Sequence, residues 1–544
     1  MPMSTMRNKK KTPRHSALRS LTTPKICSNN GGICFFRLVI ALLSVLLTQP
    51  ALSQITVTQG YHTTGRGNPR CVLLHIYLPD SLKQTFPREL RVVLKGDTRK
   101  SISNVELYQS QGDEFYAESS PQRLASVLPK EDSLELLLSP STQFQSHLWL
   151  TADIRKNARP GAVVDALLEG LGDPDGEACI YELQRLVCIP TTDNCRFYRI
   201  PAMTLDRKGN VVVAYDRRYD SNLDLGNHRI DVAVRRSFDG GRTWSPQVIV
   251  AKGDAASDGQ YGFGDPALVR TAGGRLICLM AAGKNGYFQS MRHIGITVSD
   301  DDGQTWSSPR ELTAQGFTDA VHGTTDSLGF WSIFATSGKG LLTRDGTVMF
   351  ATNTLMGLPT GTWEGSSGCY ILSSADEGNH WTLGPTLAYD HCDESKMVQL
   401  DNDSILLSVR QRGARGFNRA DASAVNWEQQ WRNDGIYNGN PCNADIIKVP
   451  FMKHTYLHTY LKHPKDRRQL QLAVSTDDCR TWHDILTIQD GGAAYSTMEF
   501  LSNNHLAVFF EDGSAGEHNG YALTFVTLTP RQLKALIRKT EKEN

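Results

Sequence analysis

SFDGGRTW, residues Ser237–Trp244, is the first of four related turn motifs that decide the fold of this chain. Related stretches start at Ser299, Ser374 and Ser475, and the four copies share the pattern S-x-D-x-G-x-T-W. An internal repeat indicates a repeat architecture before any single residue is interpreted. The four copies therefore predict a fold built from repeated units.

The residues of this turn favour a hairpin between two strands. Ile230, Val232 and Val234 alternate with other residues before the first copy, as in a half-buried strand. The Ser and Asp side chains can bind nearby backbone N–H groups, the Gly tolerates positive φ, and the Trp can anchor the turn on the sheet. His380 and Cys479 loosen the pattern in the third and fourth copies. We expect all four turns to be structural.

A calcium site at the turns is not supported. Asp300, Asp302 and Gly303 imitate part of an EF-hand loop. That loop needs a leading carboxylate and a Glu at its twelfth position. Val298 and Pro309 occupy those two places, so we expect no metal there.

The spacing of the turns predicts a β-propeller. The copies start 62, 75 and 101 residues apart. One four-stranded blade takes about 40–50 residues, and propellers have about four to eight blades. The longest gap leaves room for a blade without this turn. The segment from about Leu183 to Thr527 accommodates six blades, so we predict an all-β protein with a six-bladed propeller over residues 176–544.

The first 53 residues predict an export signal. A long basic stretch precedes the apolar run Leu38–Leu47, and Ala51-Leu52-Ser53 is a small-x-small cleavage signature before Gln54. The apolar run is too short to span a bilayer comfortably. We therefore expect a secreted or periplasmic protein with no stable membrane insertion after cleavage.

A chain of 544 residues is too long for one ordinary domain. Residues 54–175 contain no turn motif but have short alternating stretches such as Cys71–Leu78, which predict a small β-sandwich. The Gly-, Asp- and Pro-rich stretch Gly170–Gly176 marks the boundary. Near the other end, Thr529 before Pro530–Lys539 predicts a short amphipathic helix packed on the propeller.

Composition excludes some functions. The formal net charge is +1, which argues against nucleic acid as a partner. Nine of the eleven cysteines follow the predicted cleavage site, an odd number that leaves at least one thiol unpaired, and their spacings lack a zinc pattern. We expect neither a metal nor another cofactor.

The functional residues are expected outside the turns, at the ends of predicted strands. They are Arg199, Arg218, Asp224, Asp265, Glu394, Arg410, Arg467, Tyr495 and Glu511. Each one alone has an ordinary structural explanation, since a single Arg is usually solvated and a single strand Tyr usually packs.

Together these residues resemble the sialidase (neuraminidase) family of bacterial and animal type. The resemblance covers about residues 180–527, and the order and spacing of its fragments make it specific. The matching fragments are Tyr198-Arg199-Ile200-Pro201, the four turns, Asp265-Pro266, Asp393-Glu394-Ser395, Arg410, Arg467 and Ala494-Tyr495-Ser496. The region before the propeller also resembles the β-sandwich of some bacterial sialidases, which implies a carbohydrate-binding role for residues 54–175.

The resemblance implies a site for the carboxylate of sialic acid. Arg199, Arg410 and Arg467 would grip it, since guanidinium matches the planar carboxylate and keeps its proton. Glu511 would orient the first arginine. Arg218 and Asp265 would contact polar groups of the sugar away from the reacting carbon.

Three of these assignments have close competitors in the sequence. Arg468 is adjacent to Arg467, and a shift of one residue reverses the face of a strand. The distance of eight residues to Ser475 favours Arg467. Arg412 and Arg415 similarly compete with Arg410, which directly follows a predicted strand, and Asp220 competes with Asp224.

The resemblance also implies a mechanism. Tyr495 would be the nucleophile, Glu394 its general base, and Asp224 the acid that protonates the leaving oxygen. A neutral phenol avoids the repulsion that a carboxylate nucleophile would meet beside the substrate carboxylate. The predicted activity is retaining hydrolysis of terminal sialic acid from glycoproteins, glycolipids and oligosaccharides.

Two alternatives remain open. A trans-sialidase or an intramolecular trans-sialidase would share the catalytic residues. A non-catalytic sialic-acid-binding propeller, as in a lectin or adhesin, would be expected to lack Tyr495, Glu394 or Asp224, and this chain has all three.

Overall fold

The computed structural model describes residues 54–113, 115–116, 121–224, 229–253, 261–284, 292–312, 330–356, 367–438, 440–513 and 520–543. The regular secondary structure of these residues is almost entirely β-strand, so the all-β prediction is confirmed. The predicted signal segment, residues 1–53, lies outside the described residues. From Ile55 onward the chain forms one compact unit.

Three sheets precede Leu183. The first has the order β1-β3-β8-β5-β6, with β1 (Thr56–Thr58), β3 (Cys71–Tyr77), β8 (His147–Ile154), β5 (Ile102–Ser110) and β6 (Gln122–Val127). The second has the order β10-β4-β7, with β10 (Ala166–Leu168), β4 (Glu89–Leu94) and β7 (Ser133–Leu137). The third has the order β2-β11-β9, with β2 (His62–Gly65), β11 (Ala178–Tyr181) and β9 (Val163–Val164). Two short helical turns are η1 (Asp80–Leu82) and α2 (Thr98–Ser101).

Alternation along the strands builds the core of this first region. On β3, Leu74 and Ile76 are fully buried, and they pair with Leu150 and Leu148 of β8. The buried core of this region ends at Ile180. The predicted sandwich domain and its boundary at residue 175 stay a prediction.

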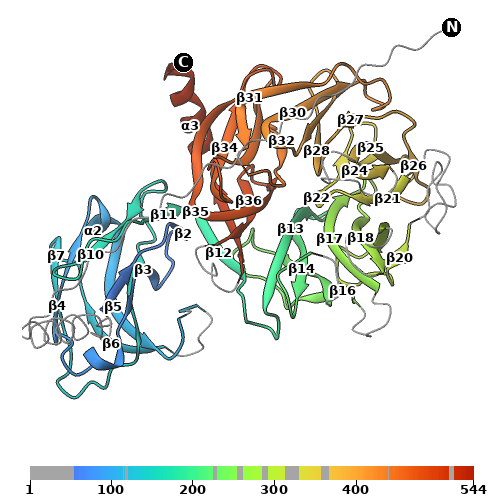
Figure 1. Ribbon diagram of the computed structural model, residues 1–544. Helices are drawn as coiled ribbons and strands as arrows, with labels where there is room; N and C mark the ends of the chain where they lie inside the picture. The colour runs from blue at the N-terminus through green and yellow to red at the C-terminus, as the bar shows by residue number, and fades with distance from the viewer. Residues whose placement is uncertain are drawn as a thin grey trace, which may run out of the picture. The chain divides into compact units, whose positions relative to one another are not determined.

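Five further sheets follow (Figure 1). The largest has the order β12-β37-β36-β35-β34-β33-β32, with β12 (Leu183–Cys188), β37 (Ala522–Leu528), β36 (Leu506–Asp512), β35 (His483–Phe500), β34 (Arg468–Ser475), β33 (Tyr456–Leu461) and β32 (Ile446–Lys448). The second is β13 (Phe197–Leu205), β14 (Val211–Arg218), β15 (Ile230–Ser237) and β16 (Val248–Ala251). The third is β20 (Arg310–Glu311), β19 (Arg292–Ser299), β18 (Leu276–Lys284), β17 (Tyr261–Arg270) and β22 (Gly338–Lys339). The fourth is β21 (Phe330–Ala335), β24 (Val348–Met356), β25 (Ser367–Ser374) and β26 (Thr382–Leu383), with β23 (Leu341–Leu342) and β27 (Tyr389–Asp390) at its side. The fifth is β28 (Ser395–Gln399), β29 (Ile405–Val409), β30 (Gly413–Ala420) and β31 (Trp431–Asn438).

Each repeated turn connects two paired strands, as predicted. The four copies join β15 to β16, β19 to β20, β25 to β26 and β34 to β35. The sheet β28–β31 lies between the third and fourth copies and has no such turn, which accounts for the longest spacing.

The turns are closed by their own side chains. In the second copy, Ser299 Oγ donates to Asp301 Oδ1 over 2.8 Å and accepts from the N–H of Gly303 over 2.9 Å. Thr305 donates to Asp301 through both its backbone N–H and its hydroxyl. In the fourth copy Cys479 replaces the Gly and keeps its left-handed backbone, at φ 66°. The glycine pattern therefore reflects backbone conformation.

Strand β35 belongs to two groups of strands. It has 18 residues, and it pairs with β34 through its first half and with β36 through its second half. In Figure 1, β12 lies beside the C-terminal strands, because it pairs with β37 from Leu183↔Thr527 onward. The long sheet can thus be divided into two four-strand groups, and the number of six blades stays a prediction.

β-bulges interrupt three of the strands that carry predicted site residues. The register shifts in β13 between Arg199 and Ala202, in β17 between Gly264 and Ala267, and in β35 between Ala493 and Ser496. Ile200 and Asp265 have left-handed backbones inside two of these bulges, at φ 60° and 55°. Bulges re-aim side chains and are frequent beside active sites.

The C-terminal helix α3 (Pro530–Glu543) is longer than predicted. It begins with a capping box, in which Gln532 N–H donates to Thr529 Oγ1 and Thr529 N–H donates to Gln532 Oε1. Leu533 and Ile537 are fully buried in the core that includes β35. Within the described residues, none of the helices is both long and apolar enough to cross a membrane.

Candidate functional site

Tyr495, Glu394 and Arg410 meet in a buried cluster. Tyr495 Oη donates to Glu394 Oε2 over 2.6 Å. Arg410 Nη1 donates to the same carboxylate oxygen over 2.5 Å and to Tyr495 Oη over 2.9 Å. Tyr495 is 8% exposed and Glu394 3%. The structure therefore brings the predicted nucleophile and its predicted base into direct contact.

The charges in this cluster keep the proton on Tyr495 and leave Glu394 ionised in the unliganded protein. Burial, and then the Glu394 carboxylate, hold the pKa of Tyr495 well above its usual value against the opposing effects of Arg410 and Arg467. Burial alone would raise the pKa of Glu394, but Arg410, Lys396 and further donors bring the net pKa below its usual value. The resting pair is a neutral phenol beside a carboxylate, as a nucleophile and its base require.

Three guanidinium groups surround the ring of Tyr495. The Cζ atoms of Arg199, Arg410 and Arg467 lie 5.7, 5.9 and 5.8 Å from its centroid. They come from β13, from the residue after β29, and from the residue before β34. Such a convergence of cations can hold a carboxylate of a bound molecule next to the tyrosine.

Glu511 of β36 is fully buried behind the first of these arginines. Its Oε1 accepts from Arg199 Nε and from the N–H of Ile200, each over 2.7 Å. Its Oε2 accepts from the N–H of Tyr495 over 3.1 Å. One carboxylate thus compensates the buried Arg199 and fixes the bulged backbones beside both site residues.

The geometry distinguishes the competing arginines. Arg467 is half-buried and faces Tyr495, whereas Arg468 is exposed. Arg415 is fully buried and donates to Ser408 Oγ over 2.9 Å, outside the hydrogen bonds of the Tyr495 cluster. Arg412 is exposed. The positions favour Arg467 and Arg410 for the predicted roles.

Arg218 connects two carboxylates at a second part of the site. It is 1% exposed and donates to Asp216 Oδ2 over 2.8 Å and to Asp224 Oδ1 over 2.9 Å. The side chain of Asp224 is 55% exposed. Burial raises the pKa of Asp224, but Arg218 and then Arg199 outweigh it and lower the pKa to about 2. Asp224 is therefore a carboxylate in the unliganded protein.

Asp265 lies close to Asp216, a residue that is not among the predicted site residues. Asp265 N–H donates to Asp216 Oδ1 over 3.0 Å, and both residues are buried. Burial, followed by the neighbouring carboxylate of Asp216, raises the pKa of Asp265. The sequence did contain a signal for Asp216, because this acidic residue directly follows the apolar run Val211–Tyr215, which the structure buries fully.

The cysteines are unsuited to nucleophilic chemistry. The nine that the structure describes are free thiols, and eight of them are buried. Burial raises the pKa of Cys71, Cys188 and Cys369 to about 12. These thiols stay protonated near neutral pH, and the thiolate is the reactive form.

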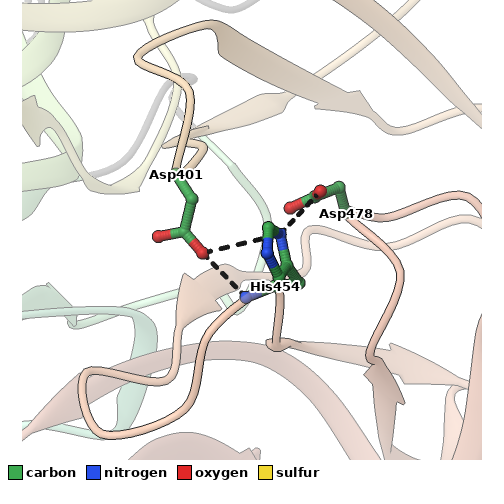
Figure 2. Close-up of side chains that lie close together, drawn as sticks. All are labelled: Asp401, His454 and Asp478. Atoms are coloured by element: carbon green, nitrogen blue, oxygen red, sulfur yellow. Dashed lines mark hydrogen bonds and ion pairs between the residues drawn. The ribbon is translucent and has the colours of Figure 1, made fainter.

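One grouping among the described residues has three possible metal ligands within 4.8 Å of one another, namely Asp401, His454 and Asp478 (Figure 2). Its oxygens already accept hydrogen bonds. His454 N–H donates to Asp401 Oδ2 over 2.7 Å, and His454 Nδ1 lies 2.9 Å from Asp478 Oδ2. The Lys448 ammonium lies 2.9 Å from Asp401 Oδ1 and supplies a positive charge. We interpret the grouping as a link between the fourth turn and neighbouring loops.

Comparison with known proteins identifies a repeat family and several sialidases as relatives. The BNR repeat-like domain family matches residues 226–508. A sialidase of Bacteroides fragilis is 26% identical over 59% of this chain and 61% of its own length. A sialidase of Micromonospora viridifaciens is 25% identical over 73% of this chain and 61% of its own length. The chain thus spans about 61% of the length of these curated relatives.

Solved structures share the fold. Hadza microbial sialidase Hz136 superposes with a TM-score of 0.65 at 21% identity, over 87% of this chain and 99% of its own. Trypanosoma rangeli sialidase, solved with the inhibitor DANA, superposes with a TM-score of 0.54 at 18% identity, over 66% of this chain and 62% of its own. The chain belongs to the BNR repeat-like domain family and is similar in sequence to bacterial sialidases.

Proposed function

We propose that this protein is a retaining exo-α-sialidase that removes terminal sialic acid from glycoproteins, glycolipids and oligosaccharides. The observation that carries the proposal is the hydrogen bond from Tyr495 to Glu394 inside a ring of three arginines. A phenol paired with a base can attack an anomeric carbon. The arginines select a sugar whose carboxylate is attached to that carbon.

Binding would place the substrate carboxylate on Arg199, Arg410 and Arg467. Guanidinium groups from separate strands would orient the anomeric carbon over Tyr495. Arg218 and Asp265 would contact polar groups on the far side of the sugar.

In the first step the Tyr495 oxygen bonds to the anomeric carbon while Glu394 takes the phenol proton. The bond from the anomeric carbon to the leaving oxygen breaks, and Asp224 gives that oxygen a proton. In the second step Asp224 takes a proton from water, and the water oxygen displaces Tyr495. Glu394 then returns its proton to the tyrosine, and two inversions leave the configuration retained.

Substrate binding would itself prepare Asp224 as the acid. In the unliganded protein Arg218, Arg199 and Arg410 lower the pKa of Asp224. A substrate carboxylate between Arg199 and Arg410 offsets part of that positive charge. The pKa of Asp224 therefore rises when the site is occupied, and the residue takes up the proton that it later donates.

The same proposal includes the domain organisation. Residues 176–544 would form a six-bladed propeller, with the seven-stranded sheet counted as two blades that share β35. Residues 54–175 would form the preceding β-sandwich domain, and residues 1–53 would direct export.

Product analysis by NMR with α2,3-, α2,6- and α2,8-linked sialosides tests the reaction. Free sialic acid that appears first as the α-anomer supports retaining hydrolysis. Transfer to an added sugar acceptor or an anhydro product would instead assign a trans-sialidase or its intramolecular form. Inverted β-product would contradict the mechanism, and binding without cleavage would assign a lectin or adhesin.

A second function is favoured by a cavity that residues of the first region line together with residues of β12 and β36. It has a volume of about 710 Å³, within the range of roughly 300–1,000 Å³ typical of small-molecule sites. His75 and Trp149 line it and stack with centroids 4.0 Å apart at 16°. Tyr116 lines it too and is 36% exposed. We propose that this cavity binds a neutral sugar ring of the glycan.

Titration of the full chain with lactose tests this second function. The substitution Tyr116→Ala should weaken binding about tenfold, whereas Tyr437→Ala, at a tyrosine 54% exposed on β31, should leave it unchanged. Turnover of a small sialoside should be equal in both variants. Equal lactose affinity in wild type and Tyr116→Ala would contradict the proposal.

A further inference from the structure

A buried hydrogen-bond chain reaches the carboxylate oxygen of Glu394 that Tyr495 does not contact. Ser337 Oγ donates to Glu394 Oε1 over 2.5 Å. The other carboxylate oxygen, Oε2, accepts from Tyr495 and Arg410. Ser337 is fully buried, so water does not compete for its hydroxyl. The two oxygens of the proposed base therefore have different and separate partners.

Asn443 holds Ser337 in place. Its Nδ2 donates to Ser337 Oγ over 2.9 Å and to the Ser337 carbonyl oxygen over 3.0 Å. Its Oδ1 accepts from Lys396 Nζ and from the N–H of Ala444, each over 2.9 Å. Donors meet the amide oxygen and acceptors meet the amide nitrogen, so only one orientation of the amide satisfies all four contacts.

The chain of bonds therefore has one direction. A lysine ammonium can only donate, which assigns the oxygen of Asn443 to Lys396 and its nitrogen to Ser337. Because Ser337 Oγ accepts from Asn443, its own proton is available for Glu394. Every donor from Lys396 onward points toward the carboxylate, and that carboxylate keeps Oε2 for the proton of Tyr495.

Burying the ammonium group of Lys396 at this position carries a desolvation cost. It is 2% exposed inside β28, and burial lowers its pKa to about 8, so the ammonium form prevails at neutral pH. Gly338, at φ +105°, makes room for it, since a Cβ there would lie 2.9 Å from Lys396 Cε. A buried charge of this kind destabilises a fold unless it is compensated, and an apolar residue of similar volume is often the more stable choice.

Other charged groups face this cation. Glu394 and Asp445 raise its pKa, while Arg415 and Lys339 lower it. Asp445 has its own partner, because Lys339 Nζ lies 3.1 Å from its Oδ2. The hydrogen-bond chain from Lys396 consequently leads to Glu394.

We propose that Lys396, Asn443 and Ser337 are positioning residues that orient the Glu394 carboxylate toward Tyr495 and keep it ionised. This inference rests on the proposed function, in which Glu394 is the base for Tyr495. The three residues touch neither the substrate nor the reacting oxygen, and they act through Glu394.

Two substitutions, Ser337→Ala and Lys396→Met, test the two ends of the hydrogen-bond chain. Each should lower kcat on a small sialoside roughly 10- to 100-fold, because a misplaced catalytic group costs up to about that factor. KM should change less than about twofold, since the arginines that hold the substrate carboxylate are untouched. The acid limb of kcat/KM should move to higher pH, because Glu394 loses a donor or a cation that lowers its pKa.

Matched controls exist elsewhere in the chain. Ser101→Ala removes a buried serine hydroxyl from the first region, and Lys448→Met removes a half-buried lysine beside Asp401. Both should leave kcat and the acid limb unchanged. The midpoint of thermal unfolding of Lys396→Met should fall, because Met leaves Asn443 Oδ1 without its Lys396 donor and Glu394 without a buried cation nearby.

Unchanged kcat in both end variants would overturn the proposal. It would equally be overturned if kcat fell with a lower unfolding midpoint and an unmoved acid limb, since that pattern indicates a structural role. Failure of the proposed function is separate, because it would appear as absence of turnover in the wild type. In that case, NMR titration of the Glu394 carboxyl carbon tests the proposal without turnover. An equal pKa of Glu394 in wild type and Lys396→Met would contradict the proposal.

Discussion

The repeated turns and the candidate site are held together in opposite ways. In the second turn, Asp301 accepts from Ser299 and Thr305, and every partner lies within four residues. In the site, Tyr495 and Glu394 are 101 residues apart in the sequence, and Arg199 and Glu511 are 312 residues apart. The turns close through hydrogen bonds between near neighbours in the sequence, whereas the site exists only when distant strands have assembled.

Because of this difference, mutations in the turns should affect mainly stability, and mutations in the site should affect mainly activity. A damaged turn loses its own hydrogen bonds and leaves the site residues in place. A damaged site residue removes chemistry, and it affects the fold only where it compensates a buried charge. Mutations in the two regions should therefore produce different pairs of changes in kcat and in the unfolding midpoint.

The largest effect is expected for Tyr495→Phe. The phenol oxygen is the proposed nucleophile, so kcat on a small sialoside should fall roughly 10⁴-fold. The ring stays, so the unfolding midpoint should change by less than about 2 °C. Steady-state kinetics and calorimetry measure the two quantities. Near-normal kcat would remove Tyr495 from the mechanism.

Glu511→Gln should affect both activity and stability. The fully buried Glu511 compensates Arg199 and accepts from the backbone of Tyr495. Removing the charge of one partner of a buried pair costs roughly 3–5 kcal/mol, which denaturant unfolding can measure. KM should rise, because Arg199 is no longer held in position. Unchanged stability would show that the pair contributes less than its burial implies.

Binding of an uncleaved sialic acid analogue should take up protons. The pKa of Asp224 is about 2 in the unliganded protein and should rise when a carboxylate offsets Arg199 and Arg410. Since the bound state then holds more protons, affinity should increase as pH falls toward about 4. Titration calorimetry in buffers of different ionisation enthalpy measures up to about one proton per site. Asp224→Asn should abolish this uptake, and uptake that persists in it would contradict the assignment.

Asp301→Ala, in the second turn, should leave kcat unchanged. It removes the acceptor of Ser299 and Thr305 and should lower the free energy of unfolding by about 1 kcal/mol, since the side chain is partly exposed. Hydrogen bonds hold the pKa of Asp301 at about 2, below its unfolded value, so its contribution is present above about pH 4 and disappears as pH falls toward 2. A clear loss of kcat would break the division between turns and site.

The turns could be predicted from the sequence because their contacts are local. Ser299, Asp301 and Gly303 carry enough chemistry to specify their own conformation. The same applies to the start of α3 after Thr529, although the helix is longer than predicted. Arg467 was separated from Arg468 by its distance from the fourth turn, and the structure places it beside Tyr495.

Other residues could not be predicted in this way because their meaning depends on strands far away. Asp216 looks like an ordinary strand end until β17 places Asp265 against it. Lys396 looks like a surface lysine in a strand until Asn443 and Ser337 surround it. The pairing of distant strands determines which residues are buried, and a buried charge needs a partner that compensates it.

The pairing of β12 with β37 has a consequence for synthesis of the chain. Leu183 of β12 pairs with Thr527 of β37, so β12 leaves the ribosome long before its partner is made. Tyr495 on β35 and Glu511 on β36 emerge in the same late stretch. A nascent chain that stops before β37 has its turns but lacks a paired β12, so its sheets are completed only once β37 has been made.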